Sequence, residues 1–143
     1  MKRLFILLIP MMAMAACSSD DDASGSSDDQ ILGTWYLAEI NNAGNLPFVV
    51  NDCTSDSNIT FNSDNTAYSE YYTVTTSSNC ISEEEEGNWS KGDEESKYTF
   101  SIPFLGPREG TVIFSSETEF SFYPDDLTSD DPNNDPYIVF EKR

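Results

Sequence analysis

The chain has 143 residues, 38 % of them hydrophobic, which is enough for one domain with a single core. Its 26 acidic residues outnumber the 7 basic ones, and this surplus excludes nucleic acid as a partner, because such binding depends on Lys and Arg that neutralise phosphates. The absence of histidine removes Ser-His and Cys-His nucleophile pairs and the commonest zinc ligand.

Residues 1–16 are predicted to be a secretory signal peptide. Lys2 and Arg3 supply its positive start, residues 4–14 are mainly apolar, and Ala15 and Ala16 are the small residues expected at a cleavage site. The apolar stretch is too short for a transmembrane helix, which needs about 20 residues. Loss of Lys2 and Arg3 with this leader would change the net charge from −19 to −21.

Met14-Ala15-Ala16-Cys17 resembles the lipobox of bacterial lipoproteins, in which small residues precede a cysteine that receives diacylglycerol. The resemblance implies that Cys17 is lipidated and that this lipid holds the protein in the cell envelope. We expect the outer membrane of a Gram-negative bacterium, at its periplasmic or its surface face. The alternative is an ordinary signal peptide followed by a Cys17 that is incidental or pairs with another chain.

Residues 17–29 are predicted to be a tether between the lipid and the folded domain. The segment consists of Ser, Asp, Gly and Ala after Cys17, and such a composition cannot bury enough apolar surface to offset its ordering entropy. Its acidic run also resembles the signal that sends some Gram-negative lipoproteins to the outer face of the outer membrane. A solvated linker has the same composition, so the leaflet stays open.

Residues 30–143 are predicted to form one all-β domain. Apolar and polar residues alternate with a period of two, and turn residues separate the runs. Short links make neighbouring strands antiparallel, and eight such strands can close as an up-and-down barrel or stack as a sandwich. The eight expected strands are 33–40, 58–62, 66–75, 81–90, 97–102, 110–115, 118–123 and 136–142.

Cys53 and Cys80 remain as an even pair when Cys17 carries lipid. Exported proteins enter a compartment that permits disulfides, and neither cysteine belongs to a Cys-x-x-Cys motif. We therefore predict a structural Cys53–Cys80 disulfide, with two buried free thiols as the alternative.

Gly33-Thr34-Trp35 at the start of the folded part is similar to the first-strand Gly-x-Trp of lipocalins, and Gly87-Asn88-Trp89 repeats it. Together with the lipobox, the acidic segment and the order of the two cysteines, it resembles the lipocalin-like domain of small bacterial lipoproteins. This resemblance implies an eight-stranded antiparallel up-and-down barrel. The family's later Thr-Asp-Tyr motif, and its arginine that packs on the tryptophan, have no clear counterpart.

The sequence contains no familiar catalytic motif, so we expect neither an enzyme nor a cofactor. A catalytic carboxylate pair of the glycosidase type remains an alternative, because the chain contains many carboxylates. The acidic runs at 83–86 and 125–135 fit no EF-hand, and we interpret them as solvated strand edges and loops rather than a metal site. A weak Ca²⁺ site at 125–135 is the alternative.

The barrel interior is the remaining candidate site, because eight strands enclose a space that side chains fill or that holds one small ligand. We predict a monomer that binds a small hydrophobic molecule through aromatic residues. The alternative is a surface-exposed module that binds another protein and has a packed interior. The predicted ligand-binding residues are Trp35, Tyr68, Tyr72, Tyr98, Phe100, Phe114 and Phe122, with Phe61, Trp89 and Phe140 as further inward-facing candidates.

Overall fold

The computed structural model describes residues 29–42, 44, 49–102 and 105–143. The predicted signal peptide, Cys17 and residues 18–28 of the predicted tether lie outside this range. None of the helices in the described part is long and apolar enough to span a bilayer.

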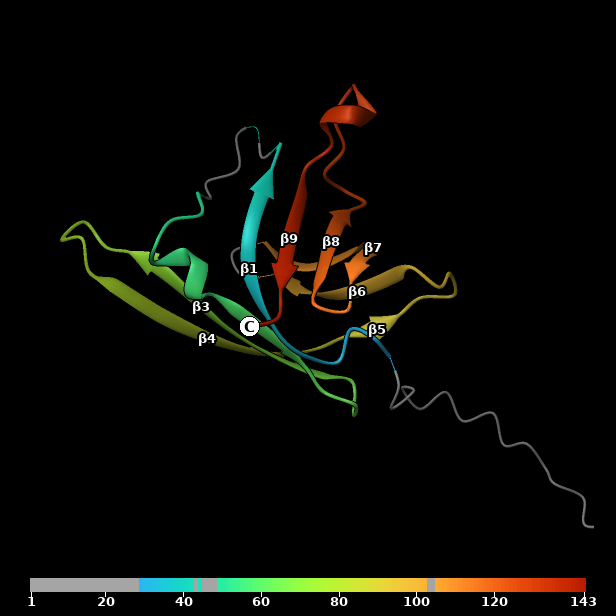
Figure 1. The fold of residues 1–143 in the computed structure, drawn as a ribbon, viewed down its shortest axis with the longest axis horizontal. Helices are drawn as coiled ribbons and strands as arrows, with labels where there is room; N and C mark the ends of the chain where they lie inside the picture. Colours follow the sequence, from blue (N-terminus) through green and yellow to red (C-terminus); the bar gives the residue numbers. More distant parts are fainter. Residues whose placement is uncertain (1–28, 43, 45–48, 103–104) are drawn as a thin grey trace, which may run out of the picture.

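Nine strands form one antiparallel sheet that curls into a nearly closed barrel (Figure 1). Strands that follow one another in the chain pair with each other, except β4 and β5, and the first strand pairs with the last, so the predicted all-β up-and-down arrangement is confirmed. The elements are β1 (Gly33–Asn41), η1 (Thr54–Asp56), β2 (Asn58–Phe61), β3 (Thr66–Val74), β4 (Cys80–Asn88), β5 (Ser90–Lys91), β6 (Lys97–Ile102), β7 (Gly106–Ser116), β8 (Glu119–Pro124), η2 (Pro132–Asn134) and β9 (Tyr137–Glu141).

The predicted count of eight strands is wrong because Trp89 divides the expected strand 81–90 into two. β4 pairs with β3, whereas β5 pairs with β6 on the other side. Between them the Trp89 side chain is buried, and its backbone and indole N–H groups donate to the carbonyls of Asn65 (2.9 Å) and Asn62 (2.8 Å). The chain therefore changes pairing partner at this tryptophan, and β4 and β5 are the two edges of the sheet.

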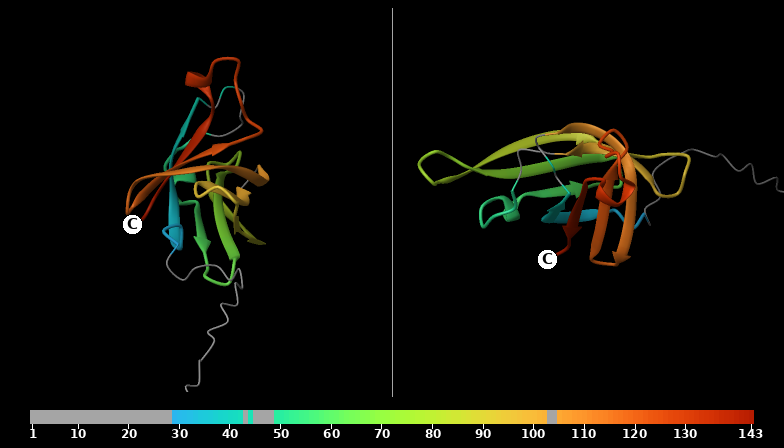
Figure 2. Two further views of the ribbon diagram at one scale, coloured as in Figure 1. Left: turned by 90° about the vertical axis from the view of Figure 1, so that its right-hand side faces the viewer. Right: turned by 90° about the horizontal axis from the view of Figure 1, so that it is seen from above.

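The β3–β4 hairpin is the longest paired unit of the wall. Its register runs from Thr66 opposite Asn88 to Val74 opposite Cys80. Figure 2 shows that the far end of this hairpin projects beyond the other strands, where the Thr75 amide donates to the Asn79 carbonyl (2.9 Å). The hairpin thus forms an extension of the wall at one end of the barrel.

The opposite end of the barrel is closed by an aromatic core around Trp35. This side chain is completely buried, its indole N–H donates to the Ile31 carbonyl (2.6 Å), and the Phe120 ring meets it edge-on at 4.7 Å. The Lys142 Nζ atom lies 4.3 Å from the centroid of the Trp35 ring. A cation therefore packs on this tryptophan, a role for which the sequence offered no clear candidate.

Asp29 fixes the beginning of the described chain to this closed end. Its carboxylate accepts hydrogen bonds from the Tyr98 hydroxyl (2.8 Å) and the Ile31 amide (3.1 Å) and pairs with Lys91 Nζ (3.0 Å). Burial acts to raise the pKa of Asp29, but these hydrogen bonds outweigh it and hold the pKa below its ordinary value. Asp29, which lies one residue before the predicted domain boundary at Gln30, thus already packs against the barrel.

Gly110 of β7 lies close to Tyr123 and Phe122 of β8. A Cβ atom at this position would lie 2.4 Å from the Tyr123 carbonyl oxygen and 2.6 Å from the Phe122 ring. The carbonyl belongs to backbone that is paired in the sheet, so it cannot move aside cheaply. Only glycine fits this approach without displacing the wall.

We predict that Gly110→Ala lowers the free energy of unfolding by about 1–3 kcal/mol, because the added methyl group overpacks the interior. Urea unfolding followed by tryptophan fluorescence would measure the loss. Gly87→Ala in β4 is the matched control, since its Cβ would meet the Ser101 side chain at an ordinary 3.8 Å. Equal stability of the two variants would contradict the prediction.

Candidate ligand-binding site

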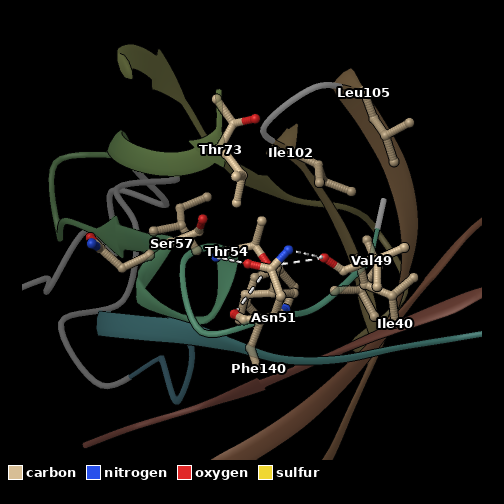
Figure 3. A pocket seen from close by; sticks show the side chains of 14 residues that line it. Ile40, Val49, Asn51, Thr54, Ser57, Thr73, Ile102, Leu105 and Phe140 are labelled. Carbon is tan, nitrogen blue, oxygen red and sulfur yellow. Dashed lines mark hydrogen bonds between the residues drawn. The ribbon is translucent and has the colours of Figure 1, made fainter. Parts of the chain in front are cut away.

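A cavity of about 510 Å³ lies at the end of the barrel opposite the aromatic core (Figure 3). There β1, β3 and β6 end, and β2 and β9 begin. The volume lies within the usual range of about 300–1,000 Å³ for small-molecule sites. The lining residues are Leu37, Ile40, Val49, Asn51, Thr54, Ser57, Asn58, Ile59, Thr73, Val74, Ile102, Leu105, Ile138 and Phe140.

The inward faces of the strands run continuously from the aromatic core to the cavity. On β6, Tyr98, Phe100 and Ile102 are all buried at alternate positions, and only Ile102 lines the cavity. Phe140 on β9 lines the cavity and stacks on Phe120 of the core at 5.0 Å. Large rings therefore fill one half of the barrel, and mostly smaller aliphatic side chains leave space in the other.

A β-bulge in β1 decides which side chains reach the cavity from this strand. Leu37 lies opposite Phe140 and Glu39 opposite Val139, so one extra residue is accommodated between them. The bulge shifts the two-residue alternation by one position. As a result Ile40 lines the cavity, whereas the Glu39 side chain is exposed.

A loop that carries η1 forms one side of the cavity mouth. The Asn51 side-chain oxygen accepts hydrogen bonds from the amides of Cys53 (2.9 Å) and Thr54 (3.1 Å). The Thr54 hydroxyl accepts from the Asn51 amide (2.8 Å) and donates to the Val49 carbonyl (2.9 Å). Asn51 and Thr54 thus hold the loop in shape at the lining of the cavity.

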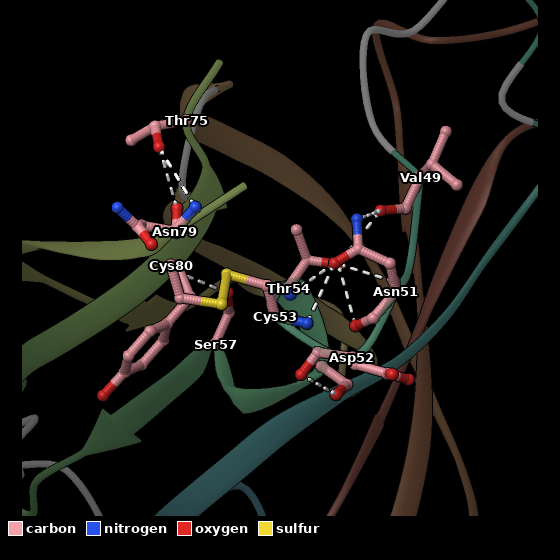
Figure 4. The surroundings of a disulfide bond; sticks show 11 residues. Val49, Asn51, Asp52, Cys53, Thr54, Ser57, Thr75, Asn79 and Cys80 are labelled. Carbon is pink, nitrogen blue, oxygen red and sulfur yellow. Dashed lines mark hydrogen bonds between the residues drawn. A yellow bond between two sulfur atoms is a disulfide. The ribbon is translucent and has the colours of Figure 1, made fainter. Parts of the chain in front are cut away.

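The predicted disulfide is confirmed and lies beside this loop (Figure 4). Cys53 bonds to Cys80 with their Cα atoms 5.7 Å apart, and the bond joins the η1 loop to the first residue of β4. Cys53 is buried, and the neighbouring Thr54 and Ser57 both line the cavity. The crosslink therefore joins the loop that lines the cavity to the start of β4, 27 residues further along the chain.

None of the seven predicted ligand-binding residues lines the cavity. Trp35, Tyr98, Phe100 and Phe122 are buried in the aromatic core, where the rings of Phe100 and Phe122 are 4.5 Å apart. Phe114 is partly buried and packs against the same core, 5.6 Å from Phe120. These aromatic side chains fill the closed half of the barrel.

Tyr68 and Tyr72 lie on the opposite face of β3 from the buried Ala67 and Ser69. The Tyr72 hydroxyl donates to the Glu70 carboxylate (2.8 Å), and this hydrogen bond, followed by burial, raises the pKa of Tyr72. Burial and the neighbouring glutamates also raise the pKa of Tyr68. Both tyrosines therefore belong to an acidic outer surface of the wall.

The aliphatic residues that line the cavity were not among the predicted ligand contacts. Ile59 and Ile102 continue the same alternation that identified Phe61 and Phe100 as inward-facing. The strand pattern therefore predicted that these isoleucines face inward. The predicted ligand contacts, however, were restricted to aromatic residues. The bulge that turns Ile40 inward leaves no comparable pattern in the sequence.

The acidic segment 125–135 uses several of its carboxylates internally. Asp125 pairs with Lys97 (2.7 Å), Asp126 pairs with Arg108 (3.1 Å), and the Asp131 carboxylate accepts from the Asn133 amide (3.0 Å). In the described part of the chain, no group of three or more His, Cys, Asp or Glu side chains is placed to hold a metal ion. The cavity, in contrast, can enclose an apolar molecule.

A meander barrel that is filled at one end and hollow at the other defines this chain as a small β-barrel with an interior cavity. The chain belongs to the lipocalin-like domain family, whose model matches residues 31–131. Among solved structures, a redesigned β-barrel is similar at 16 % identity, over 80 % of this chain and 92 % of that one, with a TM-score of 0.42. No curated protein matches the chain.

We predict that replacing both Cys53 and Cys80 with serine lowers the free energy of unfolding by about 3–4 kcal/mol, because the unfolded chain regains the entropy of a 27-residue loop. Chemical unfolding of the oxidised protein and the double variant would measure this difference. Wild-type protein under reducing conditions is the control and should behave like the variant. If neither the double substitution nor reduction changes the unfolding midpoint, the crosslink does not stabilise the barrel.

Proposed function

We propose that the chain is a lipid-anchored, non-enzymatic and monomeric protein of the bacterial envelope that binds a small hydrophobic ligand in its barrel. The cavity at the open end carries this proposal. It is large enough for a small molecule, and most of its lining side chains are aliphatic. A barrel whose only task was to be rigid would gain stability by filling this space, because interiors pack closely.

The proposed anchor rests on the sequence around Cys17 and fits the geometry of the barrel. Two or more acyl chains on one cysteine hold a protein to a membrane far more firmly than one chain does. Asp29 lies at the closed end, next to Tyr98 and Lys91, whereas the cavity opens at the other end. A tether from Cys17 would therefore join the barrel at the end away from the cavity.

A surface module that binds another protein is the second candidate function. The large exposed side chain of Ile113 on the outer face of β7, which is 53 % exposed, favours it, as does the aromatic packing of half the interior. An interaction surface requires no interior space, however. The two functions therefore differ in whether the barrel carries a small molecule.

Native mass spectrometry of the full chain, purified from its own envelope in a mild detergent, would test the proposed function. We expect a co-purifying small molecule on the wild-type protein. Ile40→Trp should lose this added mass, because the larger side chain fills the cavity that Ile40 lines. Ile113→Trp makes the same change on the exposed outer face and should retain it. A wild-type protein with no bound molecule would favour the interaction module.

Labelled fatty acid fed to the producing cells would test the anchor. We expect label on the wild-type chain and none on Cys17→Ser, because the thiol of Cys17 is the proposed site of attachment. A Cys53→Ser, Cys80→Ser double variant is the control and should keep the label, since it retains Cys17. Label on the Cys17→Ser chain would refute the lipid anchor.

A further inference from the structure

The polar groups of the cavity are few and uncharged. None of its lining residues carries a charged side chain, although the chain has 26 acidic residues. Five lining side chains are polar, namely Asn51, Thr54, Ser57, Asn58 and Thr73.

Most of these polar side chains are committed to the protein or lie near the rim. Asn51 and Thr54 form the hydrogen bonds that shape the η1 loop. The Asn58 amide donates to the Asp56 carbonyl (3.3 Å), and Thr73 is only partly buried near the end of β3. These four side chains make the mouth of the cavity polar, but they place no hydrogen-bond donor in its buried part.

Ser57 is the exception among the polar lining residues. Its side chain shares the inward face of Ile59 and Phe61, it lies on the cavity wall (Figure 3), and it is only 4 % exposed. Its Oγ atom accepts a hydrogen bond from the Tyr72 amide (2.9 Å). Within the described part of the chain the hydroxyl proton has no acceptor, so this group can donate to a molecule in the cavity.

The surroundings disfavour an anionic ligand. A carboxylate that leaves water needs a buried cation to offset its loss of hydration. Arg108, near the start of β7, already pairs with Asp126 (Nε–Oδ2 3.1 Å) and does not line the cavity. The bulge in β1 also keeps Glu39 out of the cavity, so neither sign of charge is available inside it.

We infer that the cavity selects uncharged apolar molecules that carry one hydrogen-bond acceptor, such as an ester or a ketone, and that Ser57 Oγ donates to this acceptor. The inference rests on the proposed function, because it specifies the chemistry of the same site. An ester oxygen satisfies the buried hydroxyl proton, whereas a hydrocarbon leaves it unpaired when the ligand displaces water. A fatty-acid anion of the same length meets no counter-charge.

Competition at pH 7.5 would test this inference, with native mass spectrometry of the full chain in detergent as the readout. The probes are methyl decanoate, decanoate and undecane at equal concentrations. We expect the ester adduct to exceed the decanoate adduct at least about tenfold, because the anion must leave water without a counter-charge in the cavity. In Ser57→Ala the ester adduct should fall about tenfold, while undecane binding should not fall, because the hydroxyl that a hydrocarbon leaves unpaired is gone.

Two further variants separate the hydrogen bond from a change in folding. Ser57→Thr keeps the hydroxyl and should restore ester binding. Ser69→Ala removes another buried hydroxyl, only 3 % exposed and on the inward face of β3, that does not line the cavity, and it should leave all three adducts unchanged. Near-ultraviolet circular dichroism of each variant would verify that the aromatic core is intact.

The outcomes distinguish this inference from the function on which it rests. Decanoate that binds as well as the ester, and is lost in Arg108→Gln, would overturn the inference and leave ligand binding standing. Ester binding that is unaffected by Ser57→Ala would overturn the role of Ser57. Absence of all three adducts, together with no co-purifying molecule, would overturn the proposed function itself.

Discussion

The pairing of β1 with both β2 and β9 is the constraint on which the rest of the structure depends. It curls the meander into a barrel, and each inward position then faces the same interior. Side-chain size along the barrel axis decides what this interior contains. Rings such as Trp35 and Phe120 meet at one end, whereas Ile40 and Ile138 leave a cavity at the other.

Much of the fold could be predicted from the sequence because the strands have one buried face. Period-two alternation and turn residues located the main strands and their antiparallel order, and the cysteine count identified Cys53 and Cys80 as partners. The split at Trp89 was not predictable from the same pattern. It depends on hydrogen bonds to the backbone of Asn62 and Asn65, which are distant in sequence.

The candidate site was harder to predict than the wall that encloses it. Aromatic character suggested Tyr68 and Tyr72 as ligand contacts, but the face that a strand residue presents follows from the register with its neighbours. Tyr68 pairs with Thr60 and Glu86 on the two flanking strands and faces outward with Glu70. A cavity also arises where side chains are too small to fill space, which composition alone does not reveal.

The bulge in β1 accommodates one residue more than regular pairing with β9 would allow. In a regular strand of the same length Glu39 would point inward and Ile40 outward, and a carboxylate would lie among aliphatic side chains. Deleting Ala38 would remove the bulge but keep both faces, because Glu39 would then follow Leu37 directly and still point outward. The distortion thus absorbs a surplus residue that an undistorted ladder would turn into a charge inside the barrel.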